Sequence, residues 1–341
     1  MEFKLSKRRK LESDGLDLIF ALLNRANYKE YIERTGSVPS ICLPRSATEK
    51  FLWRKVFDHN PQFSLFTDKL AVKDYLTNTF PEVPYAKVLW QGDDIRLAPP
   101  DLLGGPGFLK ANHACNTNLN LGTKSLEIDE LHAKTQEWLK LRWHTVRGQW
   151  SYKDVKPTLF IEEDLTAGTG EAVLDINVFV LGDTVSHFTV IVGSKTDHVQ
   201  YARYDPSGRR LDAAWAGKKV GPLPADYELP VAASQVCELA KKIAGGSDHL
   251  RIDFMWNGQA LHLCEITVYS HGGYGFVGTM DSALLGKIAE NWDLRRSWFL
   301  THPQTGWRRL YAAWLRRTLN ERDPGLAPCE PKDLPTQAVN S

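Results

Sequence analysis

Two short apolar runs joined by Asn257-Gly258 constrain the fold of this chain more than any other feature. The runs cover residues 250–256 and 261–267. An Asn-Gly pair between two such runs is a strong signal for a β-hairpin, because both residues tolerate the left-handed backbone of a tight turn. The charged residues of this segment lie inside the strands and not at the turn, so the hairpin is expected to present them on a sheet face.

The register of the hairpin decides which charged residues share that face. A three-residue turn over Asn257–Gln259 would place Arg251 opposite Glu265, with Asp253 as a diagonal neighbour roughly 7–8 Å away between Cα atoms. Side chains alternate along a strand, so this register predicts one largely apolar face and one polar face. The predicted polar face comprises Arg251, Asp253, Met255, Leu261, Leu263, Glu265 and Thr267.

Two neighbouring carboxylates at Asp253 and Glu265 suit Mg²⁺. This hard cation takes oxygen ligands, keeps several waters and shares its site with substrate phosphates. A structural alternative is a buried ion pair between Arg251 and Glu265, with Asp253 taking no part, since ion pairs also stabilise sheets. The hairpin by itself leaves both interpretations open.

Composition describes an ordinary globular protein without a global preference for polyanions. The chain has 341 residues, 43% of them hydrophobic, and 42 basic residues nearly balance 41 acidic ones. A net charge of +1 therefore predicts no nucleic-acid partner. The five cysteines are scattered and show no Cys-x-x-Cys pairing. This pattern argues against a zinc site or a disulfide scaffold, and it favours a protein of a reducing compartment.

The first residues do not read as a targeting segment. Residues 1–10 are basic, but the apolar run that follows, Leu18–Leu23, is short and is preceded by Asp14 and Asp17. No run reaches the length of a membrane span. We therefore expect a cytoplasmic protein.

The remaining pattern predicts an α+β fold with an antiparallel sheet within residues 158–267. Apolar residues at helical spacing, caps and turn residues mark the boundaries of the elements. Helices are expected over 14–35, 46–58, 68–76, 126–140 and 232–244, and strands over 86–89, 108–112, 158–163, 173–181, 186–192 and 198–204.

A basic amphipathic helix is predicted near the C-terminus. Its apolar residues are flanked by Arg308, Arg309, Arg316 and Arg317. Such a helix is typical of a membrane surface or a partner-binding segment, and equally of a terminal helix packed on its domain with solvated arginines. The stretch after Asp323 has the composition of a disordered end. The expected apolar face comprises Trp307, Leu310, Tyr311, Trp314, Leu315 and Thr318.

Several charged residues occur where an isolated element would not favour them. Lys110 lies within an apolar strand, where burying an ammonium group is costly without an anionic partner. Lys69 is expected in the first turn of a helix, a poor place for a cation unless an anion is near. Glu162-Glu163 and Asp175 lie in or beside strands, where a carboxylate could hold an adenine amino group or a ribose hydroxyl. Alternatively, each of these charged side chains could simply be exposed to solvent, which would require no ligand.

The order of these residues resembles the ATP-grasp superfamily, which includes D-alanine–D-alanine ligase, and more closely the TupA-like ATP-grasp family, named for a teichuronopeptide biosynthesis protein. The resemblance covers roughly residues 48–295. It rests on Lys50–Lys55, Asp58–Pro61, Asp68–Tyr75, Phe108–His113, Arg251–Asp253 and Glu265–Thr267.

The resemblance implies two α+β lobes that grip ATP, and it assigns roles to residues of this chain. It places Lys69 and Lys110 on phosphates, Glu162 and Glu163 at the adenine and Asp175 at the ribose. Arg251 would stabilise charge on the reacting acyl phosphate. The implied Mg²⁺ ligands are Asp253, Glu265 and Thr267, the last standing where many ATP-grasp ligases carry asparagine. The loop after Lys110 departs from the family, because Ala114–Asn116 lacks the usual glycines.

The implied reaction joins a carboxylate, of a uronic acid or a peptide, to an amine at the expense of ATP. The family association points to cell-surface polysaccharide biosynthesis, with its proteins as partners and peripheral contact at the inner face of the membrane. Two alternatives stay open: a phosphotransferase that stops after phosphate transfer, and a degenerate member that binds a glycan or partner without catalysis.

The same resemblance divides the chain into four parts. Residues 1–60 form an N-terminal helical region, and 61–157 a small lobe with the phosphate lysines. Residues 158–295 form a large lobe with the adenine and Mg²⁺ sites, and 296–341 the basic helix and tail. The Gly- and Tyr-rich segment 269–278 is the expected substrate loop.

Overall fold

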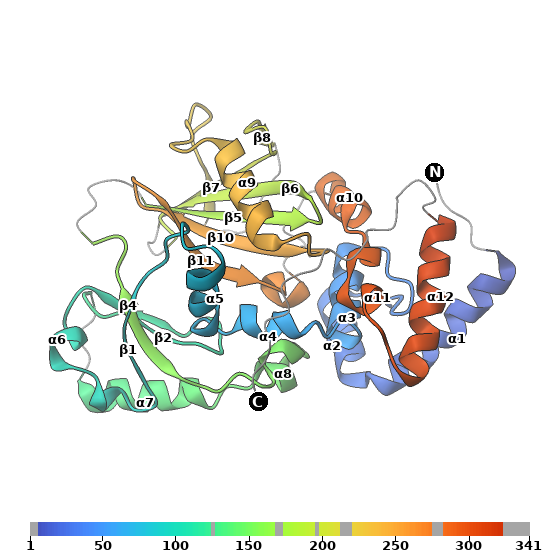
Figure 1. The fold of residues 1–341 in the computed structure, drawn as a ribbon, viewed down its shortest axis with the longest axis horizontal. Helices are drawn as coiled ribbons and strands as arrows, with labels where there is room; N and C mark the ends of the chain where they lie inside the picture. The colour runs from blue at the N-terminus through green and yellow to red at the C-terminus, as the bar shows by residue number, and fades with distance from the viewer. Residues whose placement is uncertain are drawn as a thin grey trace.

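The computed structural model describes residues 6–123, 127–167, 173–194, 198–211, 220–274 and 282–322. Within these ranges the chain forms two antiparallel sheets with helices around them (Figure 1), which confirms the α+β prediction. The end of the expected substrate loop and the segment after Asp323 lie outside the described residues.

The smaller sheet has four antiparallel strands in the order β1-β4-β2-β3. Leu109 and Ile161 lie directly opposite each other on its buried face, with Leu131 and Trp138 of α7 in the same small core. The elements of this lobe are β1 (Val88–Gly92), β2 (Gly107–Ala111), β3 (Asn118–Asn120), β4 (Leu159–Glu163), α6 (Pro100–Leu103), α7 (Ile128–Leu139), α8 (Trp143–Val146) and the 3₁₀ turns η1 (Ile95–Leu97) and η2 (Trp150–Tyr152).

The larger sheet follows the order β11-β10-β5-β6-β7-β8, and β9 pairs with β7 in parallel. Helix α9 packs on the face that carries Val178, Ile252 and Phe254. The expected sheet over residues 158–267 is thus divided, because β4 completes the smaller sheet. The elements are β5 (Leu174–Leu181), β6 (Thr184–Val192), β7 (Val199–Tyr204), β8 (Arg210–Leu211), β9 (Val220–Pro222), α9 (Ala233–Ala244), β10 (Leu250–Trp256) and β11 (Leu261–Thr267).

The remaining helices form the end of the molecule opposite the small sheet, except α4 and α5, which lie between the sheets (Figure 1). The expected helix over 14–35 is two helices that meet at Asn24, and Pro61 begins a helix, because proline suits the first helical turn. The elements are α1 (Lys7–Leu23), α2 (Arg25–Thr35), α3 (Ala47–Val56), α4 (Pro61–Thr67), α5 (Ala71–Thr79), η3 (Ser270–Gly273), α10 (Ser282–Asn291), η4 (Leu294–Arg296), α11 (Trp298–Thr301) and α12 (Gly306–Arg322).

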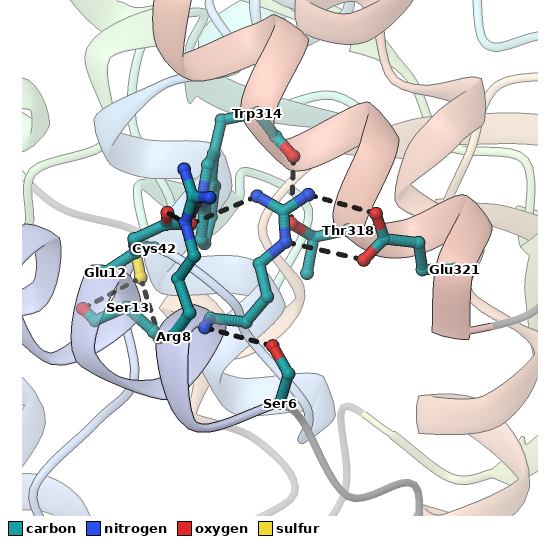
Figure 2. Close-up of polar contacts among 9 residues, drawn as sticks. Ser6, Arg8, Glu12, Ser13, Cys42, Trp314, Thr318 and Glu321 are labelled. Carbon is teal, nitrogen blue, oxygen red and sulfur yellow. Dashed lines mark hydrogen bonds and ion pairs between the residues drawn. The ribbon is translucent and has the colours of Figure 1, made fainter.

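The C-terminal helix α12 packs on the body of the protein along one side. Tyr311, Leu315 and Thr318 are buried, and the indole N–H of Trp314 donates to Glu12 of α1 (Figure 2). The expected apolar face is therefore a packing face for these residues, while Trp307 and Leu310 stay exposed. In the described ranges, no helix has the length and apolar character needed to cross a membrane.

Arg54 of α3 connects this helical end to the hairpin. Its guanidinium donates to the Asp248 carboxylate at 2.8 Å and to the Val268 carbonyl at 3.0 Å. Asp248 precedes β10 and Val268 follows β11, so one side chain holds both ends of the hairpin. Arg54 is fully buried, and the indole of Trp292 donates to the other oxygen of Asp248 at 2.7 Å.

A second buried carboxyl, Asp58, lies 3.9 Å from Arg54 and accepts a hydrogen bond from the Phe299 N–H. Burial and the charge of Asp248 raise the pKa of Asp58 to about 7, although Arg54 acts in the opposite direction. One guanidinium thus neutralises two acids, so its loss would leave buried charge without compensation.

We predict that Arg54→Met lowers the free energy of unfolding by about 3–5 kcal/mol, because the buried Asp248 loses its cation. The matched control is Arg8→Met, which removes an ion pair with Glu12 from a side chain that is 89% exposed. It should change stability by less than about 0.5 kcal/mol. Urea unfolding measures both variants, and equal effects would contradict the role of Arg54.

His249 supplies a pH-dependent contribution to stability. Its ring lies in the core against Phe51 and Trp292, and its Nδ1 lies 2.9 Å from the Val180 carbonyl. Burial and the charge of Arg54 lower the pKa of His249 to about 3. Histidine in the unfolded chain has a pKa of about 6.5, so below that pH the unfolded chain binds a proton that the folded chain does not bind. The folded state therefore loses stability as the pH falls.

Between pH 7 and pH 5, His249 should lower the free energy of unfolding by about 2 kcal/mol. We expect His249→Phe to remove that part of the loss, measured as the difference between urea unfolding at the two pH values. The exposed His302→Phe is the control. An unchanged pH dependence in His249→Phe would show that the ring is charged in the folded protein.

Candidate functional site

The hairpin forms, but its turn and its register both differ from the prediction. Trp256 pairs with Leu261, so four residues, Asn257–Ala260, connect the strands instead of the three expected. Asp253 lies directly opposite Glu265, and Arg251 lies opposite Thr267. The expected pairing of Arg251 with Glu265 is therefore wrong. The register shifts between Asp253 and Phe254, where the other strand contains the additional residue Cys264. Such a β-bulge inserts one residue into one strand, so it changes the pairing on one side only.

The longer turn and the bulge together set the faces of the hairpin. Arg251, Asp253, Glu265 and Thr267 share one face as expected. Beyond the bulge, Leu263 pairs with Phe254, and both are buried in the core. Leu261 and Leu263 therefore lie on the apolar side of the hairpin, and not with the acids. The longer turn moves Leu261 and Leu263 to the apolar side, and the extra residue Cys264 returns Glu265 and Thr267 to the polar side.

Neighbouring strands extend the polar face into a row. Asn177 of β5 lies directly opposite Asp253 of β10, which lies directly opposite Glu265 of β11. Asp175 lies two residues earlier on β5, opposite Met255, and so faces the same side. Nothing in the sequence singles out Asn177. Only the pairing of β5 with β10 brings it to the acids.

Hydrogen bonds organise the centre of this row. Arg251 donates to both oxygens of Asp253, at 2.7 and 2.6 Å. The hydroxyl of Thr267 donates to Asp253 at 3.0 Å and accepts from Arg251 at 3.2 Å. Burial raises the pKa of Asp253 and Glu265 adds to the rise, although Arg251 acts against it. Two acids share one guanidinium, so this face retains a deficit of positive charge.

The donor set fits a magnesium ion that also binds phosphate oxygens. A carboxylate offers about four lone-pair positions, and hydrogen bonds use three of those on Asp253. Glu265 and the Asn177 amide carbonyl add hard oxygen donors beside it. No group of three or more His, Cys, Asp or Glu side chains within the described ranges could hold a metal ion. A metal here would therefore depend on substrate oxygens and water for its other ligands.

The small sheet contributes a second charged cluster. Glu162 of β4 binds Lys110 of β2 through one oxygen and Lys73 of α5 through the other, the latter at 3.0 Å. Burial acts to lower the pKa of Lys110, but the charge and the hydrogen bond of Glu162, together with the nearby Cys264 and Glu265, outweigh it and the pKa is raised. Burial likewise acts to raise the pKa of Glu162, and the two lysines lower it overall. Lys110 and Glu162 are therefore both charged at neutral pH.

The two clusters face each other across the lobes. The charge of Glu265 adds to the raised pKa of Lys110. Burial, with a further contribution from Glu265, raises the pKa of Tyr152 well above its ordinary value. The backbone N–H of Leu263 donates to the Pro84 carbonyl at 2.8 Å, which joins β11 to the segment before β1. The lysines of one lobe and the acids of the other are thus close enough to interact electrostatically.

The other predicted nucleotide residues lie around these clusters. Lys69 precedes α5, and not within its first turn, and donates to the Ala114 carbonyl at 2.7 Å. Asn116 provides the left-handed residue of that loop, with φ of 59°, in place of a glycine. The carboxylate of Glu163 accepts from the Lys87 N–H at 3.0 Å. Lys73 was not assigned a role from the sequence, because only the folded chain brings it to Glu162.

A cavity of about 490 Å³ opens beside the lysine cluster. Its walls come from α5 and β1 and do not include the acids of the polar row. The lining residues are Leu70, Lys73, Asp74, Tyr85, Lys87, Val88, Leu89, Trp90 and Gln91.

Comparison with known families decides the classification. The family model described as TupA-like ATP-grasp matches residues 49–289. The chain belongs to the TupA-like ATP-grasp family. This match confirms the resemblance drawn from the sequence, and it supports an ATP-grasp ligase at the level of the family.

Solved ATP-grasp ligases resemble the structure only distantly. The ligase PsnB in complex with a minimal precursor is 14% identical at a TM-score of 0.37, over 69% of this chain and 62% of that chain. D-alanine–D-alanine ligase from Bacillus anthracis is 14% identical at a TM-score of 0.38, over 76% and 69% of the two chains. The match thus spans less than two thirds of PsnB. No curated protein matches the chain.

We predict that Lys110→Met weakens ATP binding by roughly tenfold or more, because a buried cation beside the nucleotide space is lost. Glu162 keeps Lys73 as a partner, so the variant should still fold. The control is Lys140→Met, whose side chain is 69% exposed. Calorimetry with ATP measures the affinity, and circular dichroism checks the fold. Unchanged affinity in Lys110→Met would exclude this lysine from the nucleotide site.

Proposed function

We propose that this protein is an ATP-dependent carboxylate–amine ligase that acts through an acyl phosphate. The observation that carries the proposal is the pairing of Asp253 with Glu265 across the hairpin, beside Arg251 and opposite the Lys110 cluster. Phosphoryl transfer requires mainly positioning and electrostatic stabilisation, and this arrangement supplies both signs of charge around one space.

In this proposal the small lobe holds the nucleotide. Lys110 binds a phosphate, and Lys73, which shares Glu162 with it, supports the same charge. Lys69 is proposed as a further phosphate contact, near the backbone of the Ala114 loop. Glu162 and the backbone at Glu163 border the adenine. Asp175, which lies on the same face as Asp253, is proposed to bind the ribose.

Asp253 and Glu265 are the proposed Mg²⁺ ligands. When bound, the ion supplies neutralisation of phosphate charge. Asn177 offers a neutral amide oxygen beside Asp253, the kind of donor that the family takes from the position of Thr267. We therefore propose that Thr267 orients Asp253 through its 3.0 Å hydrogen bond, and that Asn177 lies nearer the ion.

The reaction has two steps. A substrate carboxylate oxygen attacks the γ-phosphorus of ATP, the bond to the β-phosphate oxygen breaks, and ADP leaves. The nitrogen of an amine then attacks the acyl carbon, loses its proton and expels inorganic phosphate to give an amide. Arg251, which Asp253 and Thr267 hold by hydrogen bonds, is proposed to stabilise the oxyanion of the second step.

The proposed substrates follow from the family and not from a described pocket. The acid is a uronic acid or a peptide, and the amine is an amino acid or similar compound, within cell-surface polysaccharide biosynthesis. The working parts are a small lobe within residues 61–163 and a large lobe from 173 to 295. This division keeps β4 with the sheet that it completes.

The test uses Asp253→Asn and Glu265→Gln, which remove charge but keep the shape. We expect either variant to lose the Mg²⁺-dependent part of ATP affinity, on the order of tenfold or more, and all ADP release. Glu137→Gln, at an exposed acid, is the control. Calorimetry with and without Mg²⁺ measures binding. Full ADP release in either variant would overturn the metal assignment.

The same assay separates the two alternatives. A screen of uronic acids against amino acids should give an amide only when both substrates are present. Phosphorylated acid that never requires an amine would identify a phosphotransferase. Absence of ATP binding at millimolar concentration would favour the degenerate, non-catalytic protein and make the polar row a structural ion-pair network.

A further inference from the structure

Helices α1 and α12 form an antiparallel pair at the end of the molecule farthest from the small sheet (Figure 1). Arg9, near the start of α1, binds Glu321, near the end of α12, at 3.0 Å. At the other end of the pair, the rings of Phe20 and Trp307 lie 5.8 Å apart between centroids. Figure 2 shows the polar contacts that join the two helices. The termini of the described chain thus form one surface.

This surface exposes an unusual number of large apolar side chains. Among the described residues, twelve large hydrophobic side chains are exposed, and seven of them belong to α1 and α12. Single exposed leucines need no explanation, but a group of this size marks an interaction surface. We call this group the terminal patch; it comprises Leu11, Leu18, Ile19, Leu22, Leu23, Trp307 and Leu310.

Helical geometry places these residues on the outside of the pair. Leu11, Leu18 and Leu22 recur at intervals of seven and four, so they share one face of α1. That face lies opposite the buried Ser13 and Phe20. Leu18 is 64% exposed and Leu22 is 53% exposed, and no described residue covers them. Packing within this chain therefore does not explain the leucine stripe.

Basic residues outnumber acidic ones on the two helices that carry the terminal patch, although Asp14 and Asp17 lie among the leucines of α1 and its basic residues all precede Leu11. The two helices contain nine basic and four acidic residues, whereas the whole chain is nearly neutral. Leucine, isoleucine and tryptophan bordered by arginine and lysine match the chemistry of an anionic lipid surface. The exposed basic side chains are Lys7, Arg8, Lys10, Arg309, Arg316 and Arg317.

We propose that the terminal patch docks this protein on an anionic lipid surface. The apolar side chains enter the boundary between headgroups and acyl chains, and the basic side chains bind the lipid phosphates. A second copy of the chain is a poorer occupant, because a symmetric contact would bring two cationic surfaces together. The proposed contact uses residues of both α1 and α12, and not of the basic C-terminal helix alone. It uses none of the residues of the polar row, so it does not depend on the ligase proposal.

The test is sedimentation of the full chain with vesicles. Vesicles of phosphatidylglycerol and phosphatidylcholine in equal parts should bind the protein, and vesicles of phosphatidylcholine alone should not. Added salt should weaken binding, because it screens the attraction. The double variant Leu18→Glu with Leu22→Glu should weaken binding roughly tenfold or more. Replacing Arg309, Arg316 and Arg317 with glutamine should weaken it as well.

The matched control is Leu97→Glu with Ile128→Glu, two exposed apolar residues of the small lobe. This control should bind vesicles as the wild type does. Equal binding to both kinds of vesicle, or equal binding by the patch variant, would overturn the proposal. Absence of vesicle binding together with a dimer that Leu18→Glu and Leu22→Glu dissociate in analytical ultracentrifugation would also overturn it, and would make the patch a contact between copies.

Discussion

The buried guanidinium of Arg54 is the interaction on which the site depends. It holds Asp248 before β10 and the Val268 carbonyl after β11, so it fixes both ends of the hairpin relative to α3. Burying a charge is costly, and the cost is offset only when the hydrogen bonds around it are complete. Here the Trp292 indole completes Asp248 from the opposite side. A hairpin held at both ends keeps its polar face in one orientation.

The register of the strands groups acidic side chains on the large sheet and basic side chains on the small sheet. On the large sheet, Arg251 pairs with Asp253, and Glu265 lies opposite Asp253 as a second acid. On the small sheet, Lys110 and Lys73 share Glu162, which leaves an excess of positive charge. The two clusters interact, as the effect of Glu265 on the pKa of Lys110 indicates. A nucleotide with its metal carries both signs of charge, which is why the proposal assigns it to these two clusters.

Some residues of the motifs that indicated the family stabilise the fold of this chain. Lys50 donates to the carbonyls of Ala289 and Trp292 near the end of α10, and Arg54 holds the hairpin. A sequence shows that these residues belong together, but it does not show whether they contact a ligand or the protein itself. Asn177 and Lys73 illustrate the reverse case. Neither residue stands out in the sequence of its own strand or helix. Only the contacts between distant segments bring Asn177 beside Asp253 and Lys73 beside Glu162.

The sequence by itself determined the α+β class, most strands of both sheets, the hairpin, the shared face of Arg251, Asp253, Glu265 and Thr267, and the family. These follow from local periodicity and turn chemistry, which act over a few residues. Tertiary structure decided the bulge at Cys264, the placement of β4 in the small sheet and the pairing of α1 with α12. Periodicity states which side of a strand or helix is buried, but the partner that buries it is chosen by packing between segments far apart in the chain.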